Sequence, residues 1–475
     1  MKKAKNKSQT RATDNTTKEK CEDQQHPRHN ENASTSPYMV TAGLMLPVVC
    51  VVIYYVISEP SITLPNSLKP LSSEVSGWQR ASIEEEIKFN TSLCTIERRE
   101  ASSLNSEEFE KVYRYKKPLI VHFSNGAADW TDPMKWTKAS LLKLYSRWSI
   151  LSGTSEDIVR RGGNGDTQTS FNEYLDMMHE KKHNDEPMYV FDRTFYNDSD
   201  LPLSIKVPEY FNIKDGVDSS IFFLGGSGSG VSFHKHADAW NGVIFGRKRW
   251  FLYPPQKTPP GGVWPSFSQL DWINKVYPNL PLKDKPLECV QEEGEILYLP
   301  ESYYHGTVNI GDTMAIGIQK YNAATKVEKL FYKSVKERSQ LEIFQELSAL
   351  LPDSTEVLHK LAGQYFTTGD IEKSITTLEK AVHMDPLFVI AKLDLAIYYN
   401  HHGNAEKAKQ LFEEALEVHP DSFDGHIHYG EFLYEKLTKL RPDKAFGYYQ
   451  LAKCLDRIGD KDGAKTARQT AQKLS

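Results

Sequence analysis

Three histidines are the residues of this chain whose type and spacing could do metal chemistry. His234 and His236 stand two residues apart at the end of an apolar run, and side chains two apart on a strand point to the same side. His305 follows another apolar run far along the chain, so a second strand could bring it to the same place. Three such side chains form one face around a metal and leave positions open for substrate and oxygen. We therefore expect a metal centre with these three ligands.

The middle histidine bears on which metal this face would prefer. In the facial triad of iron oxygenases one ligand is a carboxylate, whereas His236 supplies no negative charge. Three histidines also hold zinc, so zinc is the alternative to Fe(II). Asp238 would lie on the same strand face, about 6.6 Å further along, and could replace the missing acid only through a bulge or a water. A second interpretation is that the histidines pack in a core and hold no metal.

The region that must position these histidines is rich in short, strand-like runs. Examples are Pro118–Val121, Met188–Phe191, Ser220–Leu224 and Gly242–Phe245, separated by Gly, Pro, Asn and Asp residues. Many short strands with turn residues between them indicate a sandwich or a barrel. We assign residues 85–325 to one domain of this kind.

From residue 340 to 475 the periodicity is helical and the sequence repeats. Pro352, Pro386 and Pro420 follow one another at the 34-residue period of tetratricopeptide repeats (TPR), with small residues where paired helices touch. A third unit begins near Phe423 but is irregular, because the residues that next match the repeat pattern come later than the 34-residue period requires. We expect an α-helical solenoid of two regular repeats, closed by a shortened or degenerate pair as a cap.

The first helix of each repeat should form a concave face that docks a polypeptide substrate or a partner protein. The alternative is that this face packs against the strand-rich domain or against a second copy. The predicted face includes Glu356, His359, Gly363 and Phe366 in the first repeat and Ile390, Leu393, Ile397 and Asn400 in the second.

The N-terminal region predicts a single membrane anchor. Residues 38–57 carry no charge and are long enough to span a bilayer as one helix, although a buried core helix or a cleaved signal peptide are the alternatives. Residues 1–37 are polar, with eight Lys and Arg, and should form a disordered cytosolic tail, whereas residues 59–78 carry only Lys69. Residues 58–84 then form a stalk. The positive-inside rule places the N-terminus in the cytosol and the body across the membrane, in a lumenal or extracellular space. Of these we expect the lumen of the endoplasmic reticulum, in the secretory pathway.

Two further sets of residues bear on this location. Asn90 and Asn197 begin glycosylation sequons that a lumenal body would expose to modification. Cys94 and Cys289 could pair in an oxidising compartment, and two buried thiols are the alternative. The net charge of -5 gives no indication of a nucleic-acid surface, so no nucleic-acid partner is expected.

The segment from Ser232 to Pro255, with Gly294–Pro300, Tyr303–His305 and Val308–Asn309, resembles the JmjC family. These are double-stranded β-helix (cupin) oxygenases that use Fe(II) and 2-oxoglutarate, and within the family the segments Gly246–Pro255 and Leu287–Pro300 look closest to a lumenal member. The resemblance implies that His234 and His305 bind the metal.

The same resemblance implies that Lys248 pairs with the distal carboxylate of 2-oxoglutarate and that Asn241 contacts this cosubstrate. Because strand faces alternate, the odd spacing between these two residues requires a bulge or turn if both face inward, and Gly242 or Gly246 could permit it. In addition to His236, two other positions depart from the family pattern. Val231 and Gly317 stand where related enzymes often have hydroxyl residues.

Two functions are compatible with this pattern. The first is a membrane-anchored lumenal dioxygenase of the protein hydroxylase type, an oxidoreductase whose repeats dock its polypeptide substrate. The alternative is a catalytically weak or inactive cupin that acts as a binding or scaffold protein. His236 favours the second function, and retention of Lys248 and Asn241 favours the first.

Overall fold

The strand-rich and helical regions follow one another along the chain as the periodicity predicts. The computed structural model describes residues 71–160, 162–163, 165–180, 186–212, 218–263, 267–320, 323–337 and 340–475. The predicted cytosolic tail, the membrane helix and most of the stalk lie outside the described residues and stay predictions. Within the described ranges, no helix is long and apolar enough to cross a membrane.

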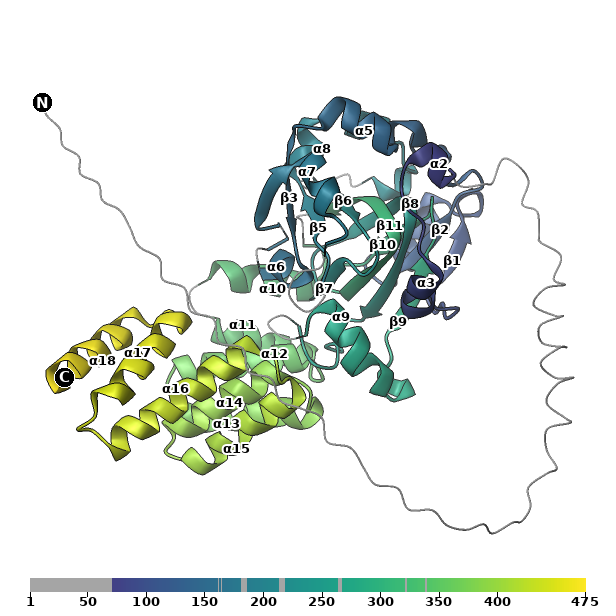
Figure 1. The fold of residues 1–475 in the computed structure, drawn as a ribbon. Helices are drawn as coiled ribbons and strands as arrows, with labels where there is room; N and C mark the ends of the chain where they lie inside the picture. Colours follow the sequence, from purple (N-terminus) through teal and green to yellow (C-terminus); the bar gives the residue numbers. More distant parts are fainter. Residues whose placement is uncertain are drawn as a thin grey trace, which may run out of the picture. The chain divides into compact units, whose positions relative to one another are not determined.

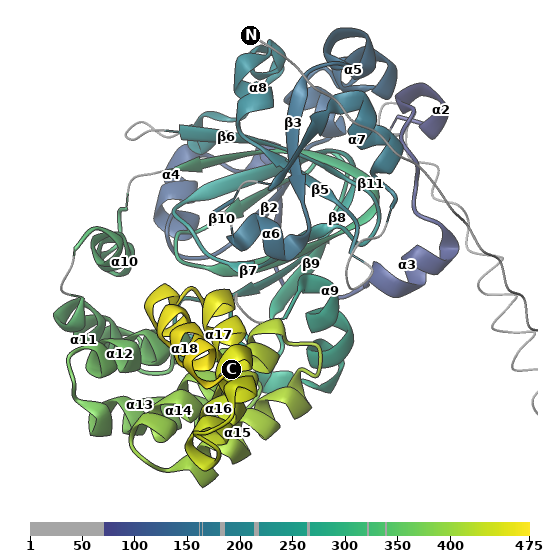
Figure 2. The same ribbon diagram turned by 60° about the vertical axis from the view of Figure 1, so that its left-hand side comes forward.

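Two long strands, β8 (Ala239–Tyr253) and β11 (Tyr304–Lys320), connect the described strands into a barrel of two sheets (Figures 1 and 2). The first half of β8 pairs with the second half of β11 in a larger sheet, between β10 and β6. The other halves pair in a smaller sheet, between β9 and β7. The remaining strands are β1 (Arg98–Glu100), β2 (Leu119–His122), β3 (Ser149–Gly153), β4 (Thr167–Ser170), β5 (Tyr189–Asp192), β6 (Asp218–Gly225), β7 (Gly230–His234), β9 (Leu287–Gln291) and β10 (Ile296–Leu299).

Glycines allow the two shared strands to bend from one sheet into the other. Gly246 in β8 and Gly311 in β11 have φ of 79° and 73°, and the register between the two strands shifts beside them. A Cβ at Gly246 would lie 2.1 Å from the carbonyl oxygen of Asp312, so only glycine fits this close approach. The predicted interruption between Asn241 and Lys248 is therefore confirmed, and it lies at the second of the two candidate glycines.

Helices cover the larger sheet on its outer face. Helices α5, α7 and α8 pack there, and their aromatic residues form a core with the strands beneath (Figure 1). For example, the Phe171 ring of α7 stacks on the Phe195 ring of α8 at 5.7 Å between ring centroids, and Phe195 lies 5.1 Å from Phe222 of β6. The described helices of this domain are α2 (Ser73–Ser76), α3 (Ile83–Phe89), α4 (Ser106–Glu108), α5 (Lys138–Tyr145), α6 (Ser155–Arg160), α7 (Phe171–Met177), α8 (Thr194–Asp198) and α9 (Gln269–Asp271).

Helix pairs with a common turn form the C-terminal region. Gly369, Gly403 and Gly459 have φ of 84°, 85° and 86°, each in the turn between two paired helices. The third pair is therefore α17 with α18 and is of full length. Of the two predicted forms of the cap, shortened or degenerate, the shortened one is wrong, and the irregularity lies in the long helix α16 before the pair. The helices are α10 (Lys326–Lys336), α11 (Leu341–Leu350), α12 (Thr355–Thr367), α13 (Ile371–Met384), α14 (Val389–His401), α15 (Ala405–Val418), α16 (Phe423–Leu440), α17 (Ala445–Ile458) and α18 (Lys461–Leu474).

The repeats pack against the strand domain through the turns that join one repeat to the next. Asp385, in the turn after α13, accepts a hydrogen bond from the backbone N–H of Gly261 at 2.8 Å. His419, in the following turn, stacks on Phe267 at 4.8 Å between ring centroids. These turns therefore contact the strand domain.

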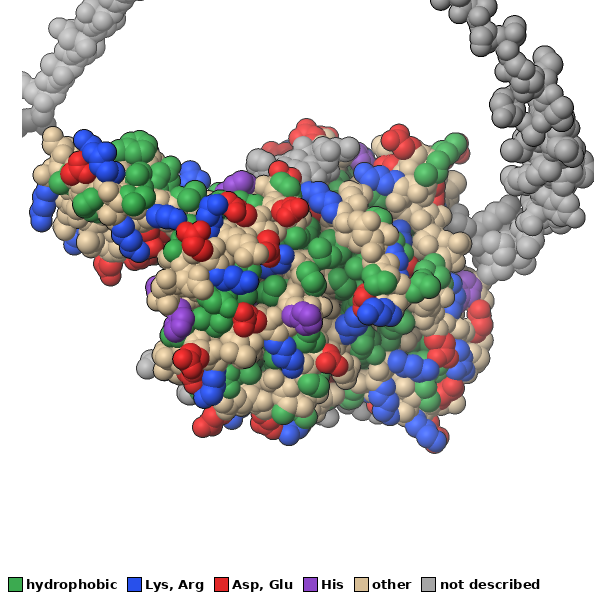
Figure 3. Space-filling view, turned by 90° about the horizontal axis from the view of Figure 1, so that it is seen from below, with side chains coloured by type: hydrophobic (Ala, Val, Ile, Leu, Met, Phe, Trp, Pro, Cys, Tyr) green, Lys and Arg blue, Asp and Glu red, His purple; other side chains and the backbone are tan. Residues whose placement is uncertain are grey.

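This packing corrects part of the predicted docking face. Glu356 is 8% exposed because the first turn of α12 is packed against the strand domain, and Leu393 is 1% exposed inside the repeat core. Ile397 and Asn400 line a hollow on the repeats together with His428 and other residues, so they stay candidates for partner contact. Seen from below, the molecule presents acidic, basic and apolar side chains interspersed over its surface (Figure 3).

Two sequence features outside the metal site also have a place in the fold. Cys94 and Cys289 form a disulfide that ties the segment before β1 to β9, so their thiols are not free. Asn90 and Asn197 are both exposed, at the end of α3 and in α8. Their glycosylation stays a prediction.

Candidate metal centre

Strand pairing brings the three predicted histidines together. His234 is the last residue of β7 and pairs with His305 of β11, while His236 lies in the loop that leads from β7 to β8. The ring centroids of His305 lie 4.2 Å from His234 and 4.5 Å from His236. One nitrogen from each ring can be chosen so that all three lie within 4.8 Å of one another, a cluster that could hold a metal ion.

Backbone carbonyls fix which nitrogen of each ring is free. The Nδ1 atom of each ring lies within hydrogen-bond distance of a backbone carbonyl oxygen. The distance is 2.9 Å from His234 to Ser232, 2.7 Å from His236 to Ala237 and 2.9 Å from His305 to Tyr303. A carbonyl oxygen can only accept, so each Nδ1 carries the hydrogen and each neutral ring keeps a lone pair on Nε2. This is the usual outer-shell arrangement of metal-binding histidines.

Burial also keeps the three rings neutral. It lowers the pKa of His234 to about 4 and that of His236 to about 3, and it lowers the pKa of His305 well below its usual value. Near neutral pH all three rings therefore offer a lone pair rather than a positive charge, which is the state that a metal requires.

Asp238 does not supply the missing acid, so its predicted role as a substitute ligand is wrong. The chain leaves β7 after His234 and turns, which ends the strand alternation on which the prediction depended. The Asp238 carboxylate is fully buried elsewhere, where it accepts hydrogen bonds from Arg114 at 2.7 Å and from the Tyr298 hydroxyl at 2.5 Å. Within the described residues, the cluster that could hold a metal contains the three histidines alone.

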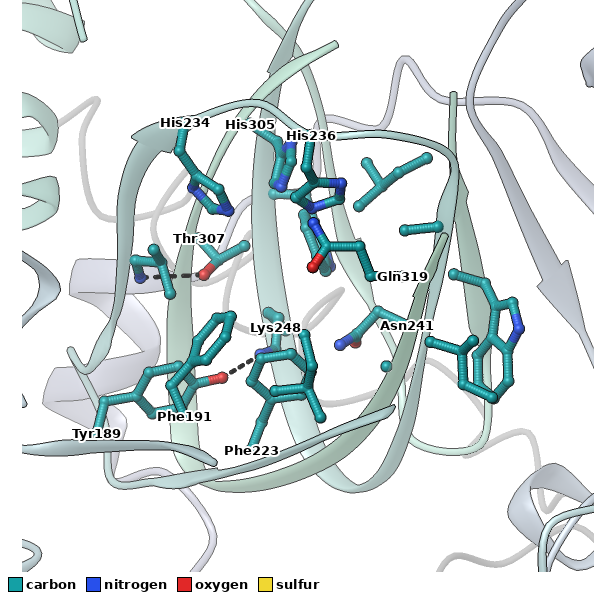
Figure 4. Close-up of a pocket in the computed structure, with 18 residues that line it drawn as sticks. Tyr189, Phe191, Phe223, His234, His236, Asn241, Lys248, His305, Thr307 and Gln319 are labelled. Carbon is teal, nitrogen blue, oxygen red and sulfur yellow. Dashed lines mark hydrogen bonds between the residues drawn. The ribbon is translucent and has the colours of Figure 1, made fainter. Parts of the chain in front are cut away.

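A buried lysine lies at the other end of the same pocket. Figure 4 shows the three histidines along one side and Lys248 at the opposite side, beside Tyr189. The Lys248 ammonium donates to the Tyr189 hydroxyl at 2.6 Å, and no carboxylate of the described residues lies within ion-pair distance of it. Burial lowers the pKa of Lys248 to about 7 because no negative charge offsets the loss of water.

The walls between these two ends are mostly apolar, with a few polar atoms directed inward. Asn241 and Thr307 line the pocket together with Val231 and Phe223. Asn241 Oδ1 is buried without a hydrogen-bond partner. A Cβ at Gly317 would lie 2.8 Å from the Phe223 ring, so an aromatic ring fills the space where related enzymes often have a hydroxyl group.

Three neutral imidazoles and a buried ammonium without a counter-charge fit a metal ion with a small dicarboxylate. His234, His236 and His305 would hold the metal, Lys248 would face the far carboxylate, and Asn241 lies between the two ends. His234 and His236 also line a second hollow, together with Arg193, so these histidines border two spaces.

Sequence reasoning missed Tyr189 and Thr307, which also line this pocket. Thr307 could have been found, since it stands two residues after His305 on β11 and so shares its strand face. Tyr189 reaches Lys248 from β5, and no local spacing relates these two residues.

Comparison with known proteins gives the family. Residues 105–324 match the cupin-like domain, and residues 355–386 and 391–422 each match a tetratricopeptide repeat. JmjC domain-containing protein 8 of Mus musculus is 30% identical over 262 residues, which cover 52% of this chain and 90% of that protein. The chain belongs to the JmjC family.

Other relatives are more distant. The bifunctional arginine demethylase and lysyl-hydroxylase psr-1 of Caenorhabditis elegans is 27% identical to the JmjC chain over 293 residues, covering 56% of this chain and 70% of that protein. The structure of YcfD, a ribosomal oxygenase from Escherichia coli, matches with 16% identity and a TM-score of 0.31 over 50% of this chain and 56% of the other. JmjC proteins generally depend on Fe(II) and 2-oxoglutarate, and the resemblance to the family predicted from the sequence is confirmed.

Proposed function

We propose that this JmjC protein is an oxygenase of the protein hydroxylase type that uses Fe(II) and 2-oxoglutarate. One observation carries the proposal: the three-histidine face and the unpaired Lys248 ammonium stand at opposite ends of one buried pocket. A dicarboxylate that reaches from a metal to a lysine matches both ends. A core that held histidines only for packing would have no need of a buried ammonium without a counter-charge.

The residues of the chain have separate tasks in this proposal. The Lys248 ammonium pairs with the distal carboxylate, and Tyr189 holds that ammonium in place. The amide N–H of Asn241 can donate to an oxygen of the cosubstrate, while Phe223 and Val231 exclude water around it. When bound, the metal and 2-oxoglutarate supply the oxidising chemistry, which is the cofactor's own.

Cosubstrate binding in the absence of oxygen tests the proposal. We expect 2-oxoglutarate to bind the Fe(II)-loaded protein and Lys248→Met to weaken this binding by about 30-fold or more, because loss of one partner of a buried charge pair costs about 2 kcal/mol or more. Lys143→Met, which removes an exposed lysine of α5, should bind like the parent. Equal binding by the parent and Lys248→Met would contradict the proposal, and succinate formation in air then measures turnover.

A weakly active or inactive binding protein is the second candidate. His236 in place of a carboxylate removes the negative charge that strengthens Fe(II) binding, and Phe223 fills the space beside Gly317. These two observations favour a JmjC domain that binds metal with little turnover and serves as a scaffold. Zn²⁺ bound more tightly than Fe(II), with no succinate formed, would favour this candidate.

We also propose that the protein is anchored in the membrane of the endoplasmic reticulum with its JmjC domain and repeats in the lumen. The uncharged run at residues 38–57 and the basic residues before it support this topology. The bond between Cys94 and Cys289 supports an oxidising compartment. The hollow that contains Ile397, Asn400 and His428 supports docking of a polypeptide on the repeats.

A further inference from the structure

The chain neighbours of the three histidines are tied to the repeat region. Lys235 stands between His234 and His236, and its ammonium forms an ion pair with the Glu356 carboxylate at 2.5 Å. Tyr304 directly precedes His305, and its hydroxyl donates to the same carboxylate oxygen at 2.6 Å. One acid of the first repeat therefore contacts both segments that carry the candidate ligands.

This contact is buried and has several members. Tyr304 is fully buried and Glu356 is 8% exposed. The Lys235 ammonium also donates to the Tyr304 hydroxyl at 3.1 Å and lies 3.6 Å from the centre of the Phe331 ring of α10. Removing one partner of such a buried charge pair strongly destabilises the folded protein, because the other charge is left buried and unpaired. The fold therefore holds the two partners firmly together.

The repeat region in turn fixes Glu356. It lies in the first turn of α12, where the positive end of the helix favours a carboxylate. The Glu356 backbone N–H donates to the Thr258 hydroxyl at 3.1 Å, and that hydroxyl also lies 3.1 Å from the hydroxyl of Ser354, the N-cap residue of α12. Glu356 is therefore held by its own helix and by the strand domain together.

The segment that needs such support is the one that carries His236. Strand β7 ends at His234, so ladder hydrogen bonds do not extend to His236, which is tied through its carbonyl oxygen to the N–H of Ser302 at 2.9 Å. The ion pair of Lys235 with Glu356 holds the same segment at a second point, between His234 and His236. We propose that Glu356 is a positioning residue, through which the first repeat holds the metal-binding histidines in place.

This inference rests on the proposed metal-dependent function, and it predicts two effects that can be measured separately. Without metal, the segment 232–238 should exchange its amide hydrogens faster when the tie is removed, because local opening becomes easier. With metal, binding should weaken by about 10- to 100-fold, as when an outer-shell partner of a ligand is lost.

The test uses Glu356→Gln, which keeps the side-chain shape and removes the charge. Because this change leaves Lys235 unpaired, the double variant Lys235→Met/Glu356→Gln provides a second, charge-free version that should fold. Asp385→Asn is the matched control, since Asp385 is also a buried carboxylate of the same interface but contacts no neighbour of a ligand. Co²⁺ serves as the probe, because its visible absorption reports ligand geometry as well as affinity.

We expect both Glu356 variants to show faster exchange in segment 232–238, weaker Co²⁺ binding and an altered Co²⁺ spectrum, with Asp385→Asn unchanged in all three. Parent-like exchange in both Glu356 variants would overturn the inference, as would an equal response of Asp385→Asn. A parent protein that binds no Co²⁺ would refute the proposed function, while the exchange experiment alone would still decide whether Glu356 holds this segment.

Discussion

Replacing Lys248 with methionine should stabilise the ligand-free protein while it removes dicarboxylate binding. Burial lowers the pKa of Lys248 from 10.5 to about 7, because the ammonium loses its water in the folded state but keeps it in the unfolded state. Below pH 7 the lysine is protonated in both states. At about 1.4 kcal/mol per pKa unit, the difference of about 3.5 units then lowers the free energy of unfolding by about 5 kcal/mol.

The sign of the pH dependence follows from the same two pKa values. Between pH 7 and pH 10.5 the folded state has released the proton and the unfolded state still binds it, so stability rises with pH. At pH 9 the remaining penalty is about 2 kcal/mol. Methionine avoids the penalty at every pH but loses the hydrogen bond to Tyr189, which reduces the gain by about 1 kcal/mol throughout.

The assay is urea-induced unfolding of the purified protein, followed by tryptophan fluorescence at pH 6 and pH 9. We expect the gain from Lys248→Met to be about 3 kcal/mol larger at pH 6 than at pH 9. Lys143→Met, at an exposed position, should show the same small effect at both pH values. A gain for Lys248→Met that does not change with pH would refute the claim that an uncompensated charge is buried in this pocket.

Four other outcomes are expected. Changing His234 and His305 together to alanine should abolish metal binding, as measured by metal content after dialysis, and parent-like content would place the site elsewhere. His236→Asp should strengthen Fe(II) binding and raise succinate formation, because it restores a negative ligand; if neither quantity changes, His236 does not bind the metal. Cys94→Ser should lower the free energy of unfolding, measured by urea-induced unfolding, by about 2–5 kcal/mol, and an unchanged free energy would mean that the disulfide does not stabilise the fold. Protease added to intact microsomes should spare the JmjC domain, whereas digestion without detergent would exclude a lumenal body.

Spacing along single strands was sufficient to predict the histidine end of the pocket, whereas the residues of its other end were identified by the resemblance to the JmjC family. His234, His305, Lys248 and Asn241 all line it, and the odd spacing of the last two required the interruption that Gly246 provides. The histidines could be found because strand alternation is local, and the same rule showed that Lys248 and Asn241, known from the resemblance, need a glycine between them to face the same side.

Contacts between distant segments could not be found in this way. Asp238 was misplaced because its partner Arg114 comes from a helical segment far back in the chain, and no local pattern shows that the two meet. Glu356 was assigned to an open groove because repeat periodicity predicts which helix face is concave, but not which repeat turns pack against another domain. The N-terminal anchor stays a prediction, because residues 38–57 lie outside the described residues.

The packing of the repeat turns against the strand domain limits how this chain can be divided. Phe251, Trp272, Val389 and Leu393 belong to one buried cluster, although the first two come from the strand domain and the last two from the repeats. A protein cut between residues 325 and 340 would expose apolar surface on both fragments, which favours aggregation over independent folding. An early stop codon or a splice variant that removed the repeats would therefore be expected to eliminate the JmjC domain as well, and a mutation deep in the repeats could produce the phenotype of a lost metal site.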